Sequence, residues 1–567
     1  MRLKNEQGVA LIFSLFTVVV LVSLSSLFVV RTVNEKNITA IERETDKSLY
    51  AAVGGAQAGL KALDHLINDL LTDTIASASP SGVVSYAAGK VASGDGIGWI
   101  LYAVRENNIT VLTQNSDQAE YAQNGTLGGH SYQYNIIMTE KSDPVAVNSS
   151  VWDFPYNFRI ESSGNPGNFP RKILIHGDFT VRVQKDNFAK YALFTNTQTL
   201  PSGTYVWFTN RTNFAGTIHT NARFNFALNP SGTFDGLAAQ HDQDARFYNN
   251  GWPVSLDAER NGNTDVPTFN AGFHRNVNTV TLTTPTQQQD MVNQAQGGQS
   301  FPQNGIYVPN SGGSLTGGIY VRGDSAIDIS VDNNNNAVYA VTQGATTKTI
   351  TIDRAGQQTT IVNSAGGPAE TYAGIPDGMD DAGTLLYVDG SITGLKGTVQ
   401  TNTELTVASS NDIVVTNHLR YTNYTPAVGN PGEAGYMPPN ADNTTNLLGL
   451  VSWNGNVRVG TSAPNDVNIH GTVLAKNGIL QVDDYNDTGR GPRGTATLLG
   501  GVITNNYGAF GLFSGATGQQ LSGYGRNFAY DERMQIGNAP PYFPTLDTFV
   551  AFTNDIADKL IWQEGGN

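Results

Sequence analysis

The sequence predicts an α+β protein in which a long N-terminal helix packs on a small antiparallel sheet and a large, β-solenoid-like all-β domain follows. Three observations predict this class. An uncharged apolar run near the N-terminus continues into an amphipathic helical pattern. Three segments with alternating polar and apolar residues come next. The rest of the 567 residues consists largely of short apolar runs separated by turns rich in glycine and asparagine.

The first element is a membrane-length helix that begins directly after Gly8. Residues 9–30 are 22 amino acids without a charge, and as a helix they span about 33 Å, enough for a bilayer core of about 30 Å. Arg2 and Lys4 precede the run, and Arg31 follows it. The positive-inside tendency therefore predicts a single-pass segment with its N-terminus in the cytoplasm and the rest of the chain outside.

The helix is expected to continue to about residue 71 as an amphipathic helix. Apolar or small residues recur at spacings of three and four, which is typical of one helix face. These positions are Ile38, Ile41, Thr45, Leu49, Ala52, Ala56, Leu60, Leu63, Ile67 and Leu70. Gly54, Gly55 and Gly59 lie in the same segment, and each costs up to about 1 kcal/mol relative to alanine. Two interpretations remain open for these glycines: close approach to another element, or ordinary packing of the helix on a sheet of the same subunit.

A connection and a small sheet are expected next. Residues 73–98 are rich in alanine, serine and glycine, which predicts a mobile linker. Residues 131–141, 156–164 and 172–183 alternate polar and apolar side chains with a period near two, as in half-buried antiparallel strands. Such a sheet would cover the apolar stripe of the helix.

The large remainder, residues 191–545, is expected to form the exposed β-solenoid-like domain. Its apolar runs are three to six residues long and are separated by glycine and asparagine, which suit tight turns. Their spacing follows no fixed period, so a pair of β-sandwiches remains an alternative. Residues 546–567 are expected to be a C-terminal tail that returns to the small sheet.

Composition excludes some classes of function. The formal net charge is −15 and only 14% of residues are charged, which argues against a general polyanion binder. The sequence contains no cysteine, so it has no disulfide and no cysteine-based zinc site. No cofactor is predicted.

The N-terminus resembles that of type IV pilins and pseudopilins, most closely the PilX-like minor pilins. The residues that carry the resemblance are a short basic leader ending in Gly8, the apolar run "VALIFSLF" and the segment "YAAVGGAQAGL". The resemblance implies that prepilin peptidase cuts between Gly8 and Val9 and that the new N-terminus, Val9, is methylated. Most pilins carry a glutamate at the fifth mature position, where this chain has Phe13. In the family, absence of this glutamate is associated with tip or priming subunits.

The C-terminal part resembles the large ComZ-type competence-associated minor pilins. The segments concerned are "GGVITNNYGAFGLFSG", "SGYGRNFAYDERM" and "PPYFPTL". Such proteins carry a β-solenoid built into a pilin module and are linked to DNA uptake in natural transformation. The implied partners are major and other minor pilins, prepilin peptidase, the inner-membrane assembly platform and extracellular DNA. The expected order is a leader at 1–8, a helix at 9–72, linker and pilin-like sheet at 73–190, then the β domain and the tail.

Candidate DNA-binding residues lie near the C-terminal end of the β domain. Arginine suits phosphate and aromatic rings suit base stacking. The candidates are Arg490, Arg493, Arg526, Tyr524 and Phe528. Nearby aspartate and glutamate residues dilute the positive charge. The alternative interpretation is aromatic packing at the end of a β stack.

Two acidic groups are candidates for the carboxylates of a polysaccharide-active enzyme. Asp324 and Asp328 lie near Arg322, and the segment "PDGMDDAG" contains Asp377, Asp380 and Asp381. The alternative is that these residues form turns, for which aspartate and glycine are well suited. No catalytic residue is predicted.

One segment offers oxygen ligands of the kind that calcium prefers. It contains Asp483, Asp484, Asn486 and Asp487, although without the spacing of an EF-hand. The eight histidines are scattered and form no zinc-binding pair, so no metal site beyond this calcium candidate is considered.

Three functional hypotheses therefore remain open. The chain is a minor pilin at or near a filament tip whose β domain captures DNA, a tip adhesin that binds a glycan or a surface, or a membrane-anchored β-helix enzyme acting on polysaccharides. The first implies an inner-membrane protein that later becomes part of an extracellular filament.

Overall fold

The computed structural model describes residues 3–94, 113–115, 118–148, 151–164, 169–209, 212–227, 232–249, 252–256, 267–429, 435–514, 519–535, 538–553 and 560–565. The chain forms two compact units. We call Met1–Lys185 together with Thr548–Asn567 the helix–sheet unit, and Asp186–Asp547 the β domain. The predicted class, α+β with a large all-β region, is confirmed.

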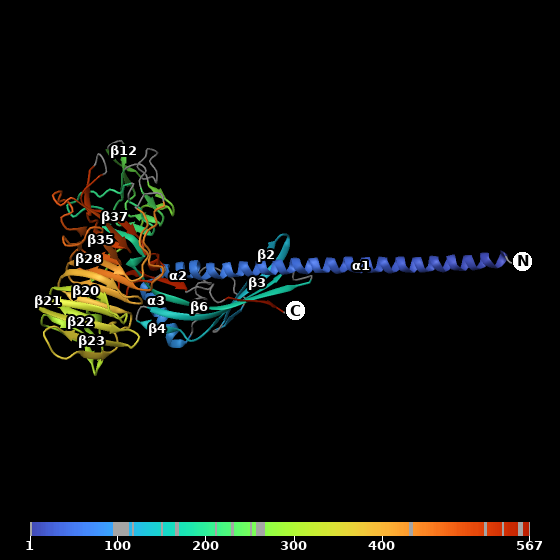
Figure 1. Cartoon of the computed structure of the whole chain (residues 1–567), viewed down its shortest axis with the longest axis horizontal. Helices are drawn as coiled ribbons and strands as arrows, with labels where there is room; N and C mark the ends of the chain where they lie inside the picture. Colours follow the sequence, from blue (N-terminus) through green and yellow to red (C-terminus); the bar gives the residue numbers. More distant parts are fainter. Residues whose placement is uncertain are drawn as a thin grey trace. The chain divides into compact units, whose positions relative to one another are not determined.

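The helix–sheet unit begins with one long helical rod (Figure 1). It consists of α1 (Leu3–Asp64), a π-helical segment (His65–Leu71) and α2 (Thr72–Ser77). The covered face of α1 starts at Ser48 and includes the fully buried residues Ala52 and Ala56. Ile38 and Ile41, expected in the same stripe, are 55% and 46% exposed.

A second helix replaces part of the predicted linker. Within the expected connection at 73–98, α3 spans Pro80–Ser93, while residues 95–98 lie outside the described part of the chain. Ser79 caps the helix by accepting a hydrogen bond from the Gly82 amide, and Gly94 ends it with a φ of 67°. Serine before proline at the start and glycine after the end are strong helix boundary signals. These signals, with the buried pair Val83 and Ala87, outweigh the linker-like composition.

The sheet of this unit is antiparallel where its register is defined, and its central strands are long. It pairs its strands in the order β1-β2-β3-β5-β6-β38, with β4 beside β5 and β39 beside β6. The strands are β1 (Thr113–Asn115), β2 (Gln118–Leu127), β3 (His130–Glu140), β4 (Val145–Asn148), β5 (Val151–Gly164), β6 (Arg171–Asn187), β38 (Thr545–Thr553) and β39 (Ile561–Gly565). Alternate residues of β3 and β5 are buried and form the core with α1. The three predicted strand segments correspond to β3, β5 and β6.

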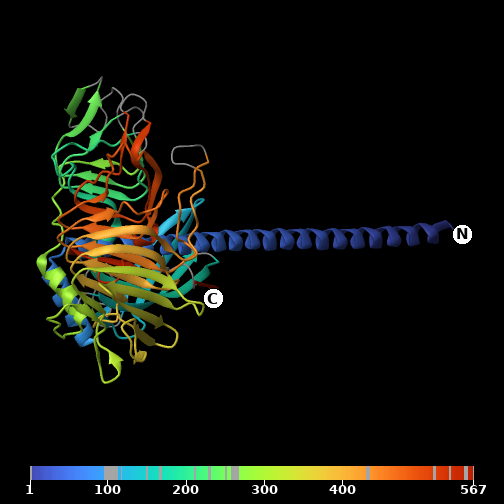
Figure 2. The same cartoon turned by 60° about the vertical axis from the view of Figure 1, so that its left-hand side comes forward.

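Among the described residues, the β domain contains two large sheets (Figure 2). The first, which we call the inner sheet, has eleven strands. In spatial order they are β15 (Phe273–His274), β11 (Ala238–Gln240), β8 (Thr217–Thr220), β7 (Tyr191–Thr197), β35 (Val502–Asn506), β32 (Thr472–Ala475), β29 (Leu447–Ser452), β27 (Glu404–Ser409), β25 (Thr384–Asp389), β19 (Ile319–Arg322) and β16 (Gly305–Tyr307).

The second, which we call the outer sheet, has fifteen described strands. They are β17 (Asn310–Ser311), β18 (Ser314–Leu315), β24 (Glu370–Ala373), β23 (Gln358–Asn363), β22 (Thr346–Asp353), β21 (Ala337–Gln343), β20 (Ser325–Val331), β26 (Ile392–Val399), β28 (Ile413–Tyr421), β31 (Asn468–His470), β34 (Pro492–Leu499), β37 (Gln520–Ala529), β36 (Gly511–Phe513), β30 (Val457–Val459) and β33 (Leu480–Val482). Smaller pairings join β9 (Asn225–Phe226), β12 (Ala245–Asn249) and β13 (Trp252–Leu256), and β10 (Thr233–Phe234) with β14 (Thr268–Phe269). The remaining elements are α5 (Pro285–Gln296) and 3-10 turns at Phe188–Lys190 and Glu532–Met534.

The chain winds through these two sheets as a coil. From β25 to β29, successive strands alternate between the inner and the outer sheet, and each pairs in parallel with its neighbours in the stack. Each circuit of the chain in this region therefore adds one strand to each sheet. The winding is not continuous in sequence, because β35 pairs in parallel with β7, which lies some 300 residues earlier. The chain therefore enters the stack in its middle.

Columns of like residues hold the inner sheet together. Leu386, Val407, Leu450 and Val473 occupy equivalent positions in neighbouring strands and are fully buried. In β25 and β29, within the inner sheet, both faces are buried, which is usual for parallel sheets. Helix α5 contributes to this cover, since the Gln288 side chain donates to the Tyr387 hydroxyl over 3.2 Å.

Candidate functional sites: an exposed apolar helix and a polar groove

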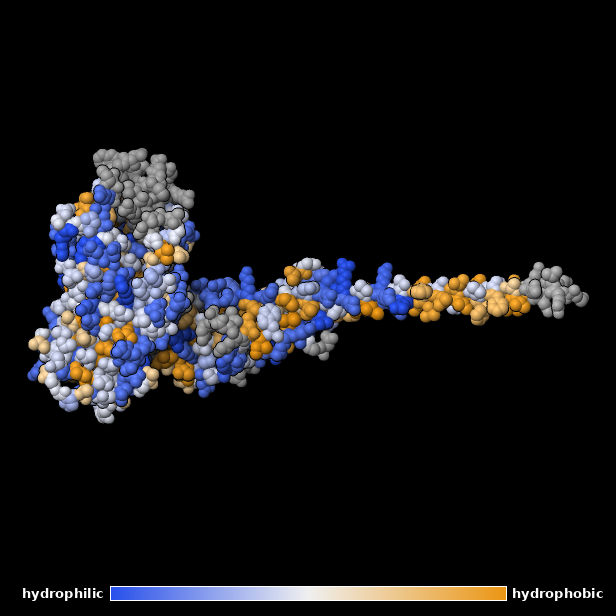
Figure 3. All heavy atoms as spheres, in the orientation of Figure 1, coloured by the Kyte–Doolittle hydropathy of each residue, from blue (hydrophilic) through white to orange (hydrophobic). Residues whose placement is uncertain are grey.

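The N-terminal half of α1 is an exposed apolar surface. Among the described residues one helix, Gly8–Ser77, is long and apolar enough to cross a membrane by length and composition, and its most apolar window is not buried at all. Leu11, Phe13 and Phe28 are each about two-thirds exposed. Figure 3 shows this stretch as a nearly continuous hydrophobic surface. Thr17 donates its hydroxyl to the Phe13 carbonyl over 2.8 Å. This bond pairs the Thr17 hydroxyl, which would otherwise lack a partner in an apolar surrounding.

The predicted processing residues lie at the start of this surface. Gly8 is helical, and a Cβ atom added to it would meet no atom within 4 Å. Val9 is 53% exposed and Phe13 is 67% exposed. Residues 1 and 2 of the expected leader lie outside the described part of the chain. Cleavage and methylation at Gly8 and Val9 stay predictions.

The three helix glycines face the sheet of the same chain. A Cβ on Gly55 would lie 2.3 Å from the Ser162 Oγ, and one on Gly59 would lie 2.7 Å from Ile160 Cγ2. A Cβ on Gly54 would lie 2.5 Å from Leu127 Cδ2. These approaches agree with the second interpretation of the glycines, packing within one subunit.

The candidate DNA-binding residues are engaged within the β domain. Tyr524 is fully buried, and its hydroxyl donates to the Pro464 carbonyl over 2.8 Å, so its ring is not available for base stacking in this structure. Arg493 lies over that ring at 4.7 Å and donates to a backbone carbonyl. Arg526 donates to the Tyr507 hydroxyl over 2.6 Å. Phe528 packs edge-on against Phe510. Arg490 is the most exposed of the three arginines, and it pairs with Asp484 over 3.3 Å.

The calcium candidates do not converge on one point. Asp483 pairs with Arg458, and Asp484 faces Arg490. Asp487 accepts a hydrogen bond from the Gly489 amide, and Asn486 is exposed. In the part of the chain that the structure describes, no three His, Asp or Glu side chains gather in a group that could hold a metal ion.

Several side chains of the two acidic groups considered for catalysis are engaged in other contacts. Arg322 donates to the Phe301 carbonyl over 2.9 Å, while Asp328 pairs with Lys396 at 3.1 Å. In the second group, Asp380 accepts a hydrogen bond from Gln294, and Asp381 has a φ of 53°, as in a tight turn.

Asp377 in the second group gives a testable pH effect. Burial and the nearby charge of Asp381 raise the pKa of Asp377 to about 6. The folded state therefore binds a proton at Asp377 more tightly than the unfolded chain does. The contribution of this proton to the free energy of unfolding is present at pH 4 and is lost as the pH rises through 6. We expect Asp377→Asn to raise the free energy of unfolding by about 1 kcal/mol at pH 8, a value reduced because the half-exposed carboxyl is screened by solvent.

Urea unfolding at pH 4 and pH 8 measures this effect. Asp332→Asn is the matched control with the opposite sign, because hydrogen bonds from the Asn336 backbone and side-chain amides, and then from the Asn334 amide, lower the pKa of Asp332. Equal stabilisation by Asp377→Asn at both pH values would contradict the assigned pKa.

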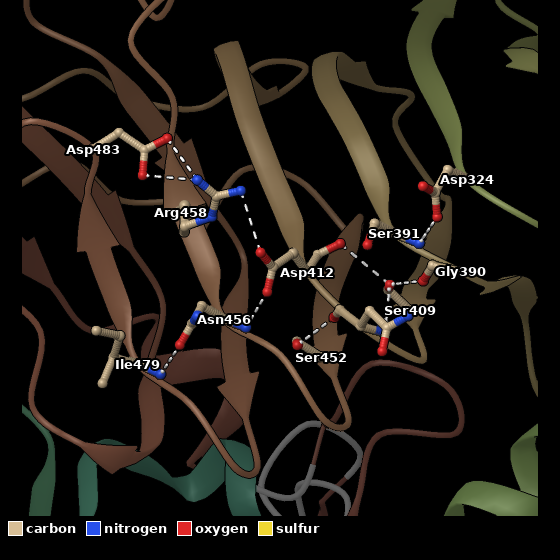
Figure 4. A network of polar contacts seen from close by, with 11 residues as sticks. Asp324, Gly390, Ser391, Ser409, Asp412, Ser452, Asn456, Arg458, Ile479 and Asp483 are labelled. Carbon is tan, nitrogen blue, oxygen red and sulfur yellow. Dashed lines mark hydrogen bonds and ion pairs between the residues drawn. The ribbon is translucent and has the colours of Figure 1, made fainter. Parts of the chain in front are cut away.

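The outer sheet carries a polar groove of about 440 Å³. Its walls come from adjacent turns of the coil, on β26, β28, β30 and the loops beside them. The lining includes Asp324, Ser391, Thr393, Asp412, Arg458 and Asp483. We call these six residues the groove residues. Figure 4 shows several of them joined in one network.

Side-chain bonds between neighbouring turns fix the groove. Asp412 accepts a hydrogen bond from the Asn456 amide over 2.8 Å and pairs with Arg458 at 3.2 Å. Arg458 also donates to both carboxylate oxygens of Asp483, over 3.0 and 2.9 Å. On the other side, Asp324 accepts from the Ser391 amide over 2.7 Å (Figure 4). The carboxylates are thus held in place before any ligand binds.

Sequence reasoning considered Asp324 and Asp483 separately and missed Ser391, Asp412 and Arg458. A signal was present in the turns. Ser391, Asp412 and Asn456 each precede an inward apolar residue that pairs with its counterpart in the next turn, namely Ile392, Ile413 and Val457. Aligning these positions as one repeat would have placed the polar residues side by side.

Comparison with known proteins gives limited matches. Residues 153–238 match a family model described as a domain of unknown function, DUF4900. No curated protein sequence matches the chain. Among solved structures, the chain is similar to competence-associated pilin ComZ from Thermus thermophilus, at 11% identity and a TM-score of 0.30, over 92% of this chain and 98% of that chain.

Proposed function

We propose that this chain is a minor subunit of a type IV pilus or a related filament and that it presents its β domain outside the cell. One observation carries the proposal. A single helix, Gly8–Ser77, exposes an uncharged apolar surface in its first half and is covered by an antiparallel sheet in its second half. The first half suits a lipid bilayer before assembly and the apolar helices of other subunits after assembly.

The proposal implies a sequence of partners. Prepilin peptidase removes the segment before Val9, the inner-membrane assembly platform extracts the subunit, and major and other minor pilins bind its helix. Phe13 lacks the charge that would pair with a neighbour's amino terminus, and burying an unpaired carboxylate in lipid is costly. A subunit without this charge pair is poorly suited to the repeating shaft of a filament. We therefore place it at or near the tip, which labelling sheared filaments with an antibody to the β domain would test.

The ligand of the β domain is a separate question. DNA capture is what the sequence resemblance implies, but the predicted arginines are engaged in internal contacts and Tyr524 is buried. The polar groove favours a second candidate function, that of a tip adhesin. Neither candidate requires catalysis.

Gly8→Ala tests the filament proposal. We expect the wild-type protein from sheared filaments to begin at Val9 and carry one methyl group, as measured by intact-protein mass spectrometry. Gly8→Ala is expected to keep the residues before Val9 and to be absent from sheared filaments. Since a Cβ at this position meets no atom within 4 Å, the substitution does not disturb the fold.

Gly89→Ala is the matched control, because this helical glycine also has open space around it. It is expected to be processed like the wild type. A wild-type protein that retains its N-terminal residues and is missing from sheared filaments would rule out the proposed function.

A further inference from the structure

We propose that the polar groove binds a neutral carbohydrate chain, one that carries hydroxyl groups but no carboxylate, sulfate or phosphate. The proposal deepens the proposed function, on which it rests, because a surface-exposed β domain meets such polymers on cells and in the environment. It assigns a ligand class to the groove of about 440 Å³ on β26, β28, β30 and their adjoining loops.

Charge is the first argument. Three carboxylates, those of Asp324, Asp412 and Asp483, line the groove together with one guanidinium, that of Arg458. Asp412 and Asp483 share this guanidinium, so the groove keeps a negative charge. The whole chain has a formal net charge of −15. A polyanion such as DNA or an acidic polysaccharide is therefore repelled, whereas a neutral chain is not.

Hydrogen-bonding capacity is the second argument. Asp324 uses Oδ1 to accept the Ser391 amide, and within the described residues its Oδ2 has no hydrogen-bond partner. The side-chain hydroxyls of Ser391, Thr461 and Ser462 also line the groove, and none of them is hydrogen-bonded to another described residue. Each sugar hydroxyl both donates and accepts. A wall that combines a carboxylate oxygen with free hydroxyls satisfies both capacities.

Shape is the third argument. Gly460 lies in the groove lining, and a Cβ there would lie 2.8 Å from Val414 Cγ1. A larger residue at this position would therefore displace Val414, which also lines the groove. The groove crosses neighbouring strands, which in a sheet are about 4.8 Å apart. An extended polymer lying across the strands would thus meet polar residues from one turn of the coil after another, and the fixed carboxylates would lose little freedom on binding.

Isothermal titration of the full chain tests the proposal. The protein is held in lipid nanodiscs, because detergents with sugar headgroups would compete. The neutral probes are dextran, cellohexaose and chitohexaose, and the charged probes are polygalacturonate and single-stranded DNA. We expect at least one neutral probe to bind and neither charged probe to bind through the groove.

Two substitutions tie binding to the groove. Asp324→Asn keeps Oδ1 for the Ser391 amide but replaces the free acceptor with a donor, and we expect it to weaken binding about tenfold. Ser391→Ala removes one free hydroxyl and should weaken binding about threefold. Asp353→Asn is the control, because Asp353 also accepts a backbone amide, that of Gly356, but lies outside the groove. Unchanged melting temperatures exclude misfolding.

Three results would overturn the assignment. These are the absence of binding by all neutral probes, equal binding by wild type and Asp324→Asn, and binding of a charged probe that the groove substitutions weaken. If the wild type shortens the neutral probes during incubation and Asp324→Asn does not, the groove is an enzymatic site and not a binding site. None of these outcomes affects the processing experiment at Gly8, so failure here is distinguishable from failure of the filament proposal.

Discussion

Replacing Phe226 with alanine is expected to lower the free energy of unfolding of the β domain by about 4 kcal/mol. Phe226 is fully buried in a cluster of phenylalanines. Its ring centroid lies 5.6 to 6.1 Å from those of six others. These are Phe208, Phe224, Phe234, Phe247, Phe269 and Phe273.

The size of the effect follows from the loss of contacts on all sides. Removing a buried ring forfeits its transfer free energy and leaves a cavity that stiff aromatic neighbours close only in part. Domains are typically stable by about 5–15 kcal/mol, so the loss is a large share. The effect is measured by urea unfolding, with hydrogen exchange of peptides from 212–227 and 232–249 as a local readout.

Phe513→Ala is the control for this substitution, since Phe513 is 39% exposed. It is expected to change stability by less than about 1 kcal/mol. If Phe226→Ala has an equally small effect, the phenylalanine cluster is not packed as described.

Gly164→Val is expected to release the helix from the sheet and to cost about 3 kcal/mol or more in the helix–sheet unit. Gly164 is the last residue of β5, and a Cβ there would lie 1.9 Å from the carbonyl oxygen of Ser48 on α1 and 2.7 Å from the Ala52 amide nitrogen. The Ser48 hydroxyl donates to the Gly164 carbonyl over 2.6 Å and accepts the Arg171 amide over 3.1 Å. Because the obstacle is backbone, no side-chain rotation relieves it.

Hydrogen exchange measures this second effect directly. Amides of residues 48–64 should lose protection in Gly164→Val, while those of the β domain stay protected. Gly89→Val is the control, because Gly89 has open space around it. Unchanged protection of the helix in Gly164→Val would show that α1 and β5 are not in close contact.

The sequence was sufficient for features that depend on local patterns. The apolar character of an uncharged run of 22 residues does not depend on the rest of the fold. The apolar, membrane-length half of α1 is therefore predictable from the sequence. The alternation in β3, β5 and β6 was equally readable, because period two reports one buried face. The helix at Pro80–Ser93 differs from the linker that its composition predicts, because the capping signals at Ser79 and Gly94 outweigh composition here.

The groove shows the limit of such reasoning. Asp324, Asp412 and Asp483 are distant in sequence, and no short motif joins them. They come together because parallel pairing stacks successive turns of the coil, which brings Asp324 and Asp412, before their strands, close to Arg458 and Asp483 of later turns. The burial of Tyr524 was equally hard to predict. An aromatic residue near arginines in the sequence can lie in a core or on a surface.

Local sequence patterns predict the membrane-length helix, the antiparallel strands that follow it and the strand-rich remainder, because each depends on residues within a few positions of one another. The tertiary structure adds three features: β7 pairs with β35, the helix glycines face their own sheet, and polar residues of separate turns form one groove. Those outcomes depend on which strands pair. Pairing between distant strands is fixed by the packing of the whole domain, which no local pattern encodes.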